Sequence, residues 1–361
     1  MKPRLLELIR CPACGDRLSV VGFDGSDQDV IDGMLTCACG ATYPIVGTIP
    51  RLFRDAWVQF PEFRTRYSEL VGHGAPAAPP VQDRAHDRRQ ARTQESFGYQ
   101  WTTFAEMACD FRENFFNYLH PATAEFFEGK VGLDAGCGFG RHLYQAARCG
   151  AEMVGVDFSR AIESSYKNTR DLPNVHLLQG DIYALPFASG TFDFAYSVGV
   201  LHHLPDPPRA TQAVANVVRD GGTFFVWVYS KKRRLLNRLL EMARSVTTRL
   251  PHRLVDWLSF VGAVIDRFGF VLPYQVGRRL PGVGASIERL TPARVKLYAQ
   301  YPFQVMHADW FDRLAAPIRY YYDEEGVREL LNGTGVTKVQ VSPTGLYGWR
   351  GCGTQRLSSG G

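Results

Sequence analysis

The feature that most constrains the fold of this chain is a glycine-rich loop between an apolar run and a helical stretch. Residues 131–133 are apolar, and an acid and three alternate glycines follow them: Asp134, Gly136, Gly138 and Gly140. Glycines at alternate positions let the backbone turn sharply and approach a ligand, and the N-terminus of the next helix offers free N–H groups to an anion. The spacing is GxGxG and not the GxGxxG of dinucleotide sites. The loop predicts a ligand site, with a structural turn as the alternative.

Strand-like and helical stretches alternate after residue 93. The apolar, β-branched runs are 131–133, 153–156, 175–178, 192–196 and 223–228, and the helical stretches between them are 142–149, 162–169 and 209–218. Such alternation predicts an α/β fold with a doubly wound, mostly parallel sheet covered on both faces.

Two further acids follow the next two predicted strands. Asp157 comes 17 residues after Gly140, where a carboxylate could chelate ribose hydroxyls, and Asp181 ends the next strand. Asp181 could accept a hydrogen bond from an adenine amino group while Ile182 covers the ring. Open α/β sheets bind ligands beyond the carboxyl ends of their strands. One acid alone could be an ordinary loop residue, but three in sequential strand order predict a binding site.

Five segments resemble the successive motifs of the class I S-adenosylmethionine-dependent methyltransferases, in their type 11 small-molecule branch. They are LDAGCGFGR, VGVDFS, GDIYALPF, FDFAYSVGVLHHLPDP and RDGGTFFVWVY. The resemblance implies S-adenosylmethionine as cofactor and a seven-stranded sheet whose final strand is antiparallel. By position, it implies that Asp134 and the three glycines line the methionine part, Asp157 the ribose, and Asp181 with Ile182 the adenine. It also places Phe158 in this site, and Ser197 and Val198 beside the sulfonium.

Two histidines after the fourth predicted strand are the candidate catalytic residues. A sulfonium is already an activated methyl donor, so catalysis requires in-line positioning and, for a hydroxyl acceptor, removal of a proton. His202 and His203 have an ordinary pKa of about 6.5, which suits a general base at neutral pH. The alternative is that both histidines only shape the loop. The expected reaction is methyl transfer to an oxygen or nitrogen of a small or natural-product-like acceptor.

Four of the eight cysteines cluster near the N-terminus as two Cys-Gly turns. Cys11 and Cys14 form a CxxC pair, and Cys37 and Cys39 form a CxC pair. Two thiol pairs on tight turns suit a structural Zn²⁺ with four thiolates. With the residues that follow, this segment resembles the zinc-ribbon modules of tRNA methyltransferase activator proteins. The short CxC turn leaves a metal-free ribbon and redox chemistry as alternatives.

Composition shifts divide the chain into five parts. We expect a zinc ribbon at 1–55, a linker at 56–92, the cofactor-binding core at 93–230, a helical insertion that shapes the acceptor pocket at 231–310, and a helix with strands completing the sheet at 311–361. Phe97, Tyr99 and Trp101 resemble the aromatic helix that covers the cofactor in this branch, although core packing explains them equally well.

The charge pattern bears on partners. The net charge of +5 is too small to indicate a nucleic-acid partner, but residues 231–253 carry eight Lys or Arg against the single acid Glu241. This stretch could contact an anionic membrane surface, an acidic partner or RNA, or be a solvated helix face. An RNA base methyltransferase is therefore the main alternative, and a non-catalytic module that only holds cofactor is another. The absence of an apolar run of 18 residues or of a signal-peptide core before Cys11 favours the cytoplasm.

Overall fold

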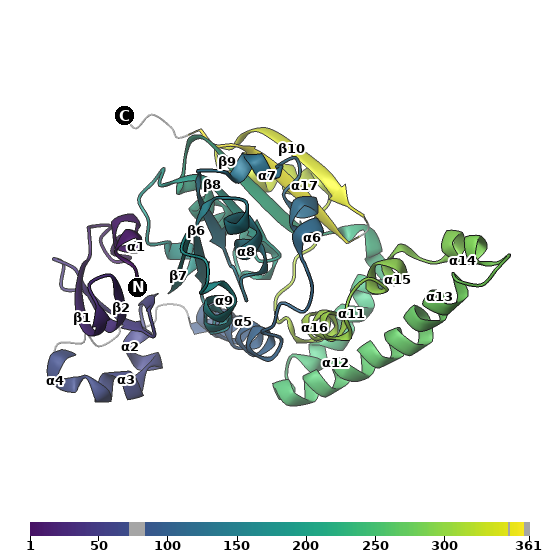
Figure 1. Cartoon of the computed structure of the whole chain (residues 1–361), viewed down its shortest axis with the longest axis horizontal. Coiled ribbons are helices and arrows are strands. Elements are labelled where there is room, and N and C mark those ends of the chain that lie inside the picture. The colour runs from purple at the N-terminus through teal and green to yellow at the C-terminus, as the bar shows by residue number, and fades with distance from the viewer. Residues whose placement is uncertain (72–83, 346, 357–361) are drawn as a thin grey trace.

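The computed structural model describes residues 1–71, 84–345 and 347–356. Within them, one sheet has 11 strands in the order β1-β2-β3-β4-β7-β6-β5-β8-β9-β11-β10 (Figure 1). Its main strands are β5 (Val131–Ala135), β6 (Glu152–Asp157), β7 (Val175–Gly180), β8 (Phe192–Val198), β9 (Val218–Tyr229), β10 (Thr337–Thr344) and β11 (Gly348–Thr354). Strands β5 to β9 pair in parallel, and β11 runs antiparallel to both β9 and β10. The predicted α/β fold with a mostly parallel core is confirmed.

Helices cover both faces of this sheet. Helices α8 (Arg141–Arg148) and α9 (Ala161–Thr169) pack on one face, and α10 (Pro207–Asn216) and α17 (Glu324–Asn332) on the other. Strand β9 shows why, because its buried side chains alternate between the hydrophobic cores on the two faces of the sheet. Phe224 and Val226 pack with α10 and α17, whereas Phe225 and Trp227 pack on the side of α8 and α9. Successive side chains of a strand point to opposite faces, so an apolar run predicts a strand covered twice.

The N-terminal ribbon is continuous with the main sheet, so the whole sheet has more strands than the seven expected for the core. It consists of α1 (Pro3–Leu8), β1 (Ser19–Ser26), β2 (Asp29–Thr36), β3 (Thr42–Val46) and β4 (Ile49–Leu52). Strand β4 pairs in parallel with β7, with Arg51 opposite Gln179 and Leu52 opposite Gly180. The sheet therefore exceeds seven strands because the edge strand β7 accepts another strand. Residues 131–354 contribute seven of the 11 strands.

The segment expected to be a linker is partly helical. Residues 56–71 form α2 (Ala56–Gln59), α3 (Pro61–Arg66) and α4 (Ser68–Val71). They pack on the ribbon, because the Trp57 indole donates to the Thr42 carbonyl at 3.0 Å and Phe63 stacks on Phe23. Residues 56–71 of the expected linker are therefore folded against the ribbon, and residues 72–83 lie outside the described part of the chain. Helix α5 (Arg84–Thr103) then begins within the expected linker range.

Shorter helices complete the core. Helices α6 (Arg112–Tyr118) and α7 (Ala124–Phe127) precede β5, and one-turn 3₁₀ helices follow β7 at Ile182–Ala184, β8 at Leu201–His203 and β9 at Lys231–Arg233. Phe115 and Phe127 are fully buried against the α8 face of the sheet. These elements therefore close the face on which α8 lies.

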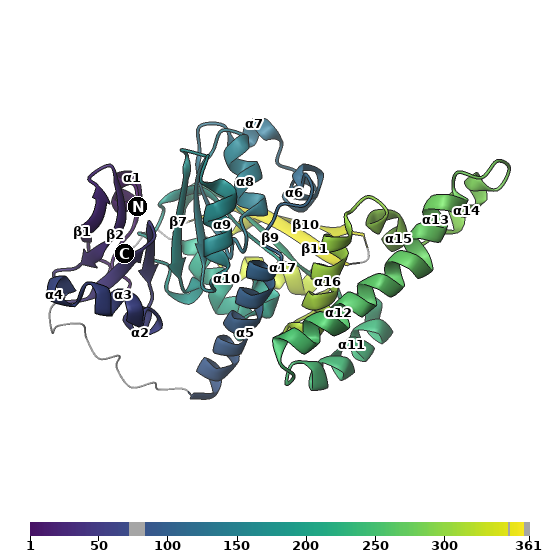
Figure 2. The same cartoon turned by 60° about the horizontal axis from the view of Figure 1, so that its bottom comes forward.

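Helices fill residues 234–315, where an insertion was expected. They are α11 (Arg234–Thr247), α12 (His252–Asp266), a π-helical turn (Arg267–Val271), α13 (Leu272–Gly277), α14 (Gly284–Leu290), α15 (Ala293–Tyr298) and α16 (Phe303–Ala315). Helices α12 to α14 project away from the sheet, at the end opposite the ribbon (Figures 1 and 2). Among the described helices, none has the length and apolar character needed to cross a membrane.

Candidate active site

A cavity of about 550 Å³ opens at the carboxyl ends of the central parallel strands. Most of the predicted cofactor residues line it: Asp134, Gly136, Gly138, Asp157, Phe158, Asp181, Ile182 and Val198. Gly140 and Ser197 do not line it. The Ser197 hydroxyl instead donates to the Ala135 carbonyl at 2.9 Å, which holds β8 to β5. The structure therefore brings together eight of the ten predicted residues.

The glycine loop has the backbone that its sequence predicts. Gly136, Gly138 and Gly140 all have positive φ, at 88°, 54° and 85°. A Cβ at Gly136 would lie 2.4 Å from Val200, and one at Gly140 would lie 2.5 Å from the Ser165 hydroxyl. Gly140 is thus required for packing α8 against α9, and Gly136 for the close approach of Val200, whereas a Cβ at Gly138 would only touch the Trp101 ring at 3.5 Å.

Asp134 is a buried acidic residue that lines the cavity. Its side chain is 2% exposed, and within the described residues its Oδ2 atom has no hydrogen-bond partner. Burial raises the pKa of Asp134 to about 8. A buried ionised carboxylate without a partner costs several kcal/mol, so a cationic ligand group beside it would be strongly favoured. The carboxylate therefore fits the ammonium group of an amino-acid-like ligand.

The carboxylate of Asp157 joins the glycine loop to the end of β6. One oxygen accepts from the Gly138 N–H at 2.9 Å, and the other accepts from the N–H and hydroxyl of Ser159 at 2.8 and 2.7 Å. Burial raises the pKa of Asp157. The carboxylate faces the cavity with a fixed orientation, which suits it to accept from paired hydroxyl groups.

Asp181 has a comparable fixed position at the end of β7. Its side chain accepts from the Tyr183 N–H at 2.9 Å and caps the 3₁₀ turn that begins at Ile182. Because this turn places the 93% buried Ile182 against the cavity, an acceptor oxygen and an apolar surface lie side by side. This pairing matches what a flat, amino-bearing ring requires.

Helix α5 covers the cavity with one of its faces. Phe97 and Trp101 line the cavity, and Trp101 stacks on Phe139 with ring centroids 4.8 Å apart. Tyr99 lies between them in sequence but on another face of the helix, where it stacks on Phe311. The sequence predicted that all three could cover the cofactor. In the structure, Phe97 and Trp101 line the cavity, whereas Tyr99 packs against another helix.

The two predicted catalytic histidines differ in position. His202 is fully buried, does not line the cavity, and neither ring nitrogen has a partner among the described residues. His203 lines the cavity, and its Nδ1 donates to the Ile318 carbonyl at 2.8 Å. Burial lowers the pKa of His203 to about 4, against the attraction of Asp312. The structure therefore favours His203 as the residue that can meet a ligand.

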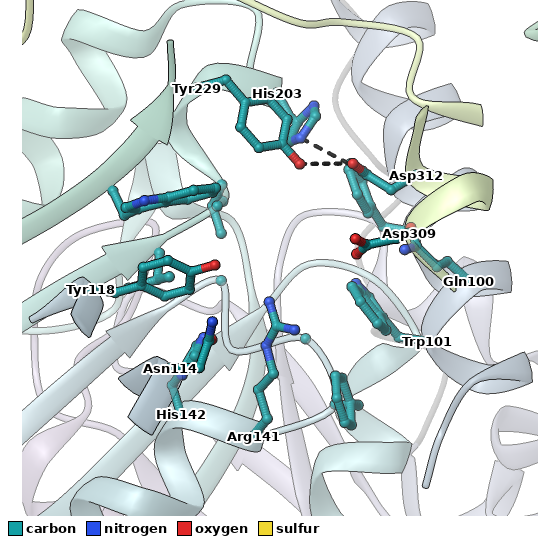
Figure 3. A pocket seen from close by; sticks show the side chains of 18 of the residues that line it. Gln100, Trp101, Asn114, Tyr118, Arg141, His142, His203, Tyr229, Asp309 and Asp312 are labelled. Atoms are coloured by element: carbon teal, nitrogen blue, oxygen red, sulfur yellow. Dashed lines mark hydrogen bonds and ion pairs between the residues drawn. The ribbon is translucent and has the colours of Figure 1, made fainter. Parts of the chain in front are cut away.

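His203 belongs to a polar cluster that the sequence did not reveal (Figure 3). Its Nε2 lies 3.8 Å from Oδ1 of Asp312, and the other carboxylate oxygen, Oδ2, accepts from the Tyr229 hydroxyl at 2.8 Å and from Arg319 at 2.6 Å. Although burial opposes it, Arg319 and His203 hold the pKa of Asp312 below its usual value. Tyr229 could have been found from its place at the end of β9, but no local pattern distinguishes Asp312 or Arg319.

Arg141 projects into the middle of the same cavity (Figure 3). Its guanidinium lies over the rings of Trp101, Phe111 and Phe139, at 5.4 to 5.8 Å from their centroids. Among the described side chains, no carboxylate is within ion-pair distance of it. Arg141 is therefore a second charged group, of opposite sign to Asp134, that is available to a ligand.

The four predicted zinc ligands form a compact group in the ribbon. Their sulfur atoms all lie within 4.8 Å of one another, with Cys11 and Cys39 3.8 Å apart and Cys14 and Cys37 3.4 Å apart. Tetrahedral Zn²⁺ with bonds of about 2.3 Å would place sulfurs about 3.8 Å apart. All four are free thiols. The donor set fits a structural zinc, and it leaves no open coordination position.

Comparison with known proteins identifies two parts of the chain. Residues 133–226 match the family described as "Methyltransferase domain", and residues 2–47 match the family described as "Trm112p-like protein". A 151-residue segment is 29% identical to the ubiquinone biosynthesis O-methyltransferase of Coxiella burnetii, and covers 40% of this chain and 64% of that protein. A 216-residue segment is 31% identical to an uncharacterized protein of Synechococcus sp., and covers 58% and 48%.

One of the similar solved structures is a complex. The complex between the Haloferax volcanii Trm112 methyltransferase activator and the putative methyltransferase is 12% identical, covers 74% of this chain and 100% of that chain, and has a TM-score of 0.43. The chain spans less than two thirds of the length of the curated relatives it matches. The resemblance expected from the motifs is confirmed, because the chain carries a Trm112p-like domain at residues 2–47 and a methyltransferase domain at residues 133–226.

Proposed function

We propose that this chain transfers the methyl group of S-adenosylmethionine to an oxygen or nitrogen of a small-molecule acceptor. The observation that carries the proposal is the unpartnered Oδ2 of Asp134, buried beneath the glycine loop, with Asp157 and Asp181 at the ends of the next two strands. Asp134 would bind the ammonium group, Asp157 the ribose hydroxyls, and Asp181 with Ile182 the adenine. The similarity to an O-methyltransferase supports the same reaction class.

When bound, the cofactor supplies a methyl group already activated on a sulfonium. The protein must then align the acceptor and, for a hydroxyl acceptor, take up its proton. Because His203 Nδ1–H donates to the Ile318 carbonyl, Nε2 carries the lone pair that can accept this proton. Asp312, 3.8 Å from Nε2, would stabilise the imidazolium that results. We propose His203 as the base, in preference to His202.

The ribbon has a proposed role within the chain itself. Arg51 of β4 donates to the Gln179 side chain at 3.0 Å, and Gln179 donates to the Phe158 carbonyl at 2.9 Å. Phe158 lines the cavity next to Asp157, so this relay connects the ribbon to the expected ribose site. We propose that the zinc ribbon stabilises the cofactor end of the sheet.

Titration calorimetry with S-adenosylmethionine and its demethylated product tests the cofactor site. Replacing Asp134 by Asn should weaken binding by about tenfold or more, because a hydrogen bond between charged groups contributes about 1.5 to 3 kcal/mol. The ligand-free variant should be no less stable than the wild type at pH 8, because the raised pKa of Asp134 makes stability fall as pH rises from about 4 through 8. Unchanged affinity in the variant would remove Asp134 from the site.

Incubation with methyl-labelled cofactor and fractionated cell extract tests the acceptor class. We expect label to enter small molecules. Label in RNA, with binding that weakens steeply as salt increases, would instead support the RNA methyltransferase alternative. Binding of cofactor without transfer to any fraction would support a non-catalytic module.

A further inference from the structure

The helical insertion exposes far more apolar side chains than the rest of the molecule. Sixteen of the 22 large hydrophobic side chains that are exposed among the described residues lie between residues 235 and 297. Folded monomers rarely expose apolar patches of more than a few hundred Å², and larger patches mark binding surfaces. We define the arm as residues 252–290, which comprise α12, the π-helical turn, α13 and α14. The arm extends away from the sheet in both views (Figures 1 and 2).

The long helix of the arm is apolar on two faces. The inner face packs against α16 and includes the buried Val255 and Ala263. The outer face has an apolar residue every three or four positions, in the series Leu254, Trp257, Val261, Ile265, Phe268, Leu272 and Val276. All of these except the half-buried Val261 are between 40% and 62% exposed. This spacing places the series along one side of the helix, so it forms a continuous apolar stripe.

The exposed charges around this stripe are four arginines and one acid, Glu288. Arg253, Arg278, Arg279 and Arg289 are exposed. The acids of the arm have partners: Asp266 is buried against Arg294 and Trp310, Asp256 lies 2.9 Å from the His307 ring, and Glu288 accepts from Tyr274 at 2.5 Å. An anionic occupant is therefore complementary to this face.

We propose that the arm docks on an anionic lipid surface. The exposed Trp257 and Phe268 would enter the interface between headgroups and acyl chains, while the arginines beside them contact lipid phosphates. A second copy of the chain fits less well, because a two-fold contact would bring the same arginines together. RNA would satisfy the arginines but leave the apolar stripe in water.

Vesicle flotation tests the proposal with the full chain. The protein should float with vesicles of equal parts phosphatidylglycerol and phosphatidylcholine, and far less with phosphatidylcholine alone. Binding should weaken as salt is added, because attraction to surface charge is screened. Charge reversal in Arg278→Glu/Arg279→Glu should reduce partitioning by about tenfold or more, at roughly 1 kcal/mol for each residue near the surface.

Paired substitutions separate the arm from the rest of the surface. Trp257→Ser/Phe268→Ser should reduce partitioning by about tenfold or more, from the loss of buried apolar area. The matched control is Val58→Ser/Leu70→Ser, which changes two equally exposed apolar residues on the helices beside the ribbon and should leave partitioning unchanged. Since all four side chains are exposed, thermal melts should show that both variants fold.

Several outcomes would overturn the proposal. One is a wild-type protein that does not float with anionic vesicles at low salt, and another is an equal loss in the arm and control variants. Sedimentation that shows a dimer dissociated by Trp257→Ser/Phe268→Ser would assign the stripe to a second copy. Retention of RNA that depends on Arg278 and Arg279, without vesicle binding, would assign the arginines to nucleic acid.

Discussion

The ribbon and the helical insertion are both additions to one α/β core, but they differ in how far their apolar side chains are buried. The ribbon buries Leu35, Ile45 and Leu52 almost completely, and the last of these lies on the strand that joins the main sheet. The insertion leaves Trp257 and Phe268 about 60% exposed. The difference indicates that the ribbon's apolar residues stabilise the fold, whereas many of those in the insertion are available for binding.

The two additions also meet the cavity on different sides. The ribbon reaches Phe158, beside the expected ribose site, through Arg51 and Gln179. Helix α16, which begins within the insertion, supplies Asp312 to the cluster around His203. If this division is functional, changes in the ribbon should alter fold and cofactor binding, and changes around Asp312 should alter turnover.

Removal of zinc should have the largest effect on stability, and the loss of structure should be confined to the ribbon. We expect about one zinc per chain by elemental analysis, and chelation should unfold residues 1–55, because structural zinc sites contribute about 10 kcal/mol or more to folding of small modules. Hydrogen exchange should show lost protection in β1 to β4 and retained protection in α12 and α16. Protein purified without chelator that contains no zinc would contradict this.

The variant His203→Ala should test the insertion side. Its turnover should fall by roughly 10² to 10⁴, the usual contribution of a positioned base, while cofactor affinity stays close to that of the wild type. His203→Gln is the matched control, because it can still donate to the Ile318 carbonyl but cannot take up a proton. Recovery of activity in His203→Gln would make His203 a positioning residue, and full activity in both variants would favour a nitrogen acceptor.

The pH dependence of stability should reveal the same histidine. The pKa of His203 is about 4 in the folded protein and about 6.5 in the unfolded chain, so the unfolded state binds more protons between these values. Stability should therefore fall as pH decreases from 6.5 to 4, by about 2 kcal/mol at pH 5. Denaturant unfolding at pH 7 and pH 5 gives the free energy of unfolding of the wild type and of His203→Gln. The difference between the two proteins should change by this amount between the two pH values. An equal loss in both proteins would show that His203 titrates normally.

On the cofactor side, Asp157→Ala should weaken S-adenosylmethionine and its demethylated product alike. The loss of the acceptor for two ribose hydroxyls should cost about 2 to 3 kcal/mol. Because Asp157 also accepts from the Gly138 N–H at 2.9 Å, Asp157→Asn serves as a control that keeps an acceptor oxygen. Calorimetry that finds the same affinity in Asp157→Ala and wild type would remove the ribose assignment.

The smallest effect on cofactor binding should come from breaking the hydrogen bonds that link Arg51 through Gln179 to Phe158. Arg51 is 1% exposed and donates to the Gln179 side chain, the Val46 carbonyl and Glu163. Arg51→Met should destabilise the protein by about 1 to 3 kcal/mol, because three acceptors lose their donor. Cofactor affinity should fall less than in Asp157→Ala. Glu163→Gln is the control, since it leaves the Arg51 contact with Gln179 intact. A cofactor affinity that Arg51→Met does not change would separate the ribbon from the site.

Local patterns accounted for the parts of the molecule that depend on neighbours in sequence. Apolar, β-branched runs predicted the strands, alternate glycines predicted the sharply turning loop, and paired Cys-Gly turns predicted the thiol cluster. Because the ends of parallel strands meet at one edge, the order Asp134, Asp157 and Asp181 was sufficient to predict that these residues share a cavity.

Only the tertiary structure decided the features that join distant segments. His202 and His203 are neighbours with the same ordinary pKa, yet only His203 lines the cavity, because its ring is held by Ile318 and faces Asp312 from α16. The pairing of β4 with β7 depends on an edge strand more than 120 residues away, as the contact of Arg51 with Gln179 shows. Helical spacing alone does not tell whether the apolar stripe of the arm is buried or exposed. It is exposed because α16 covers only one face of α12.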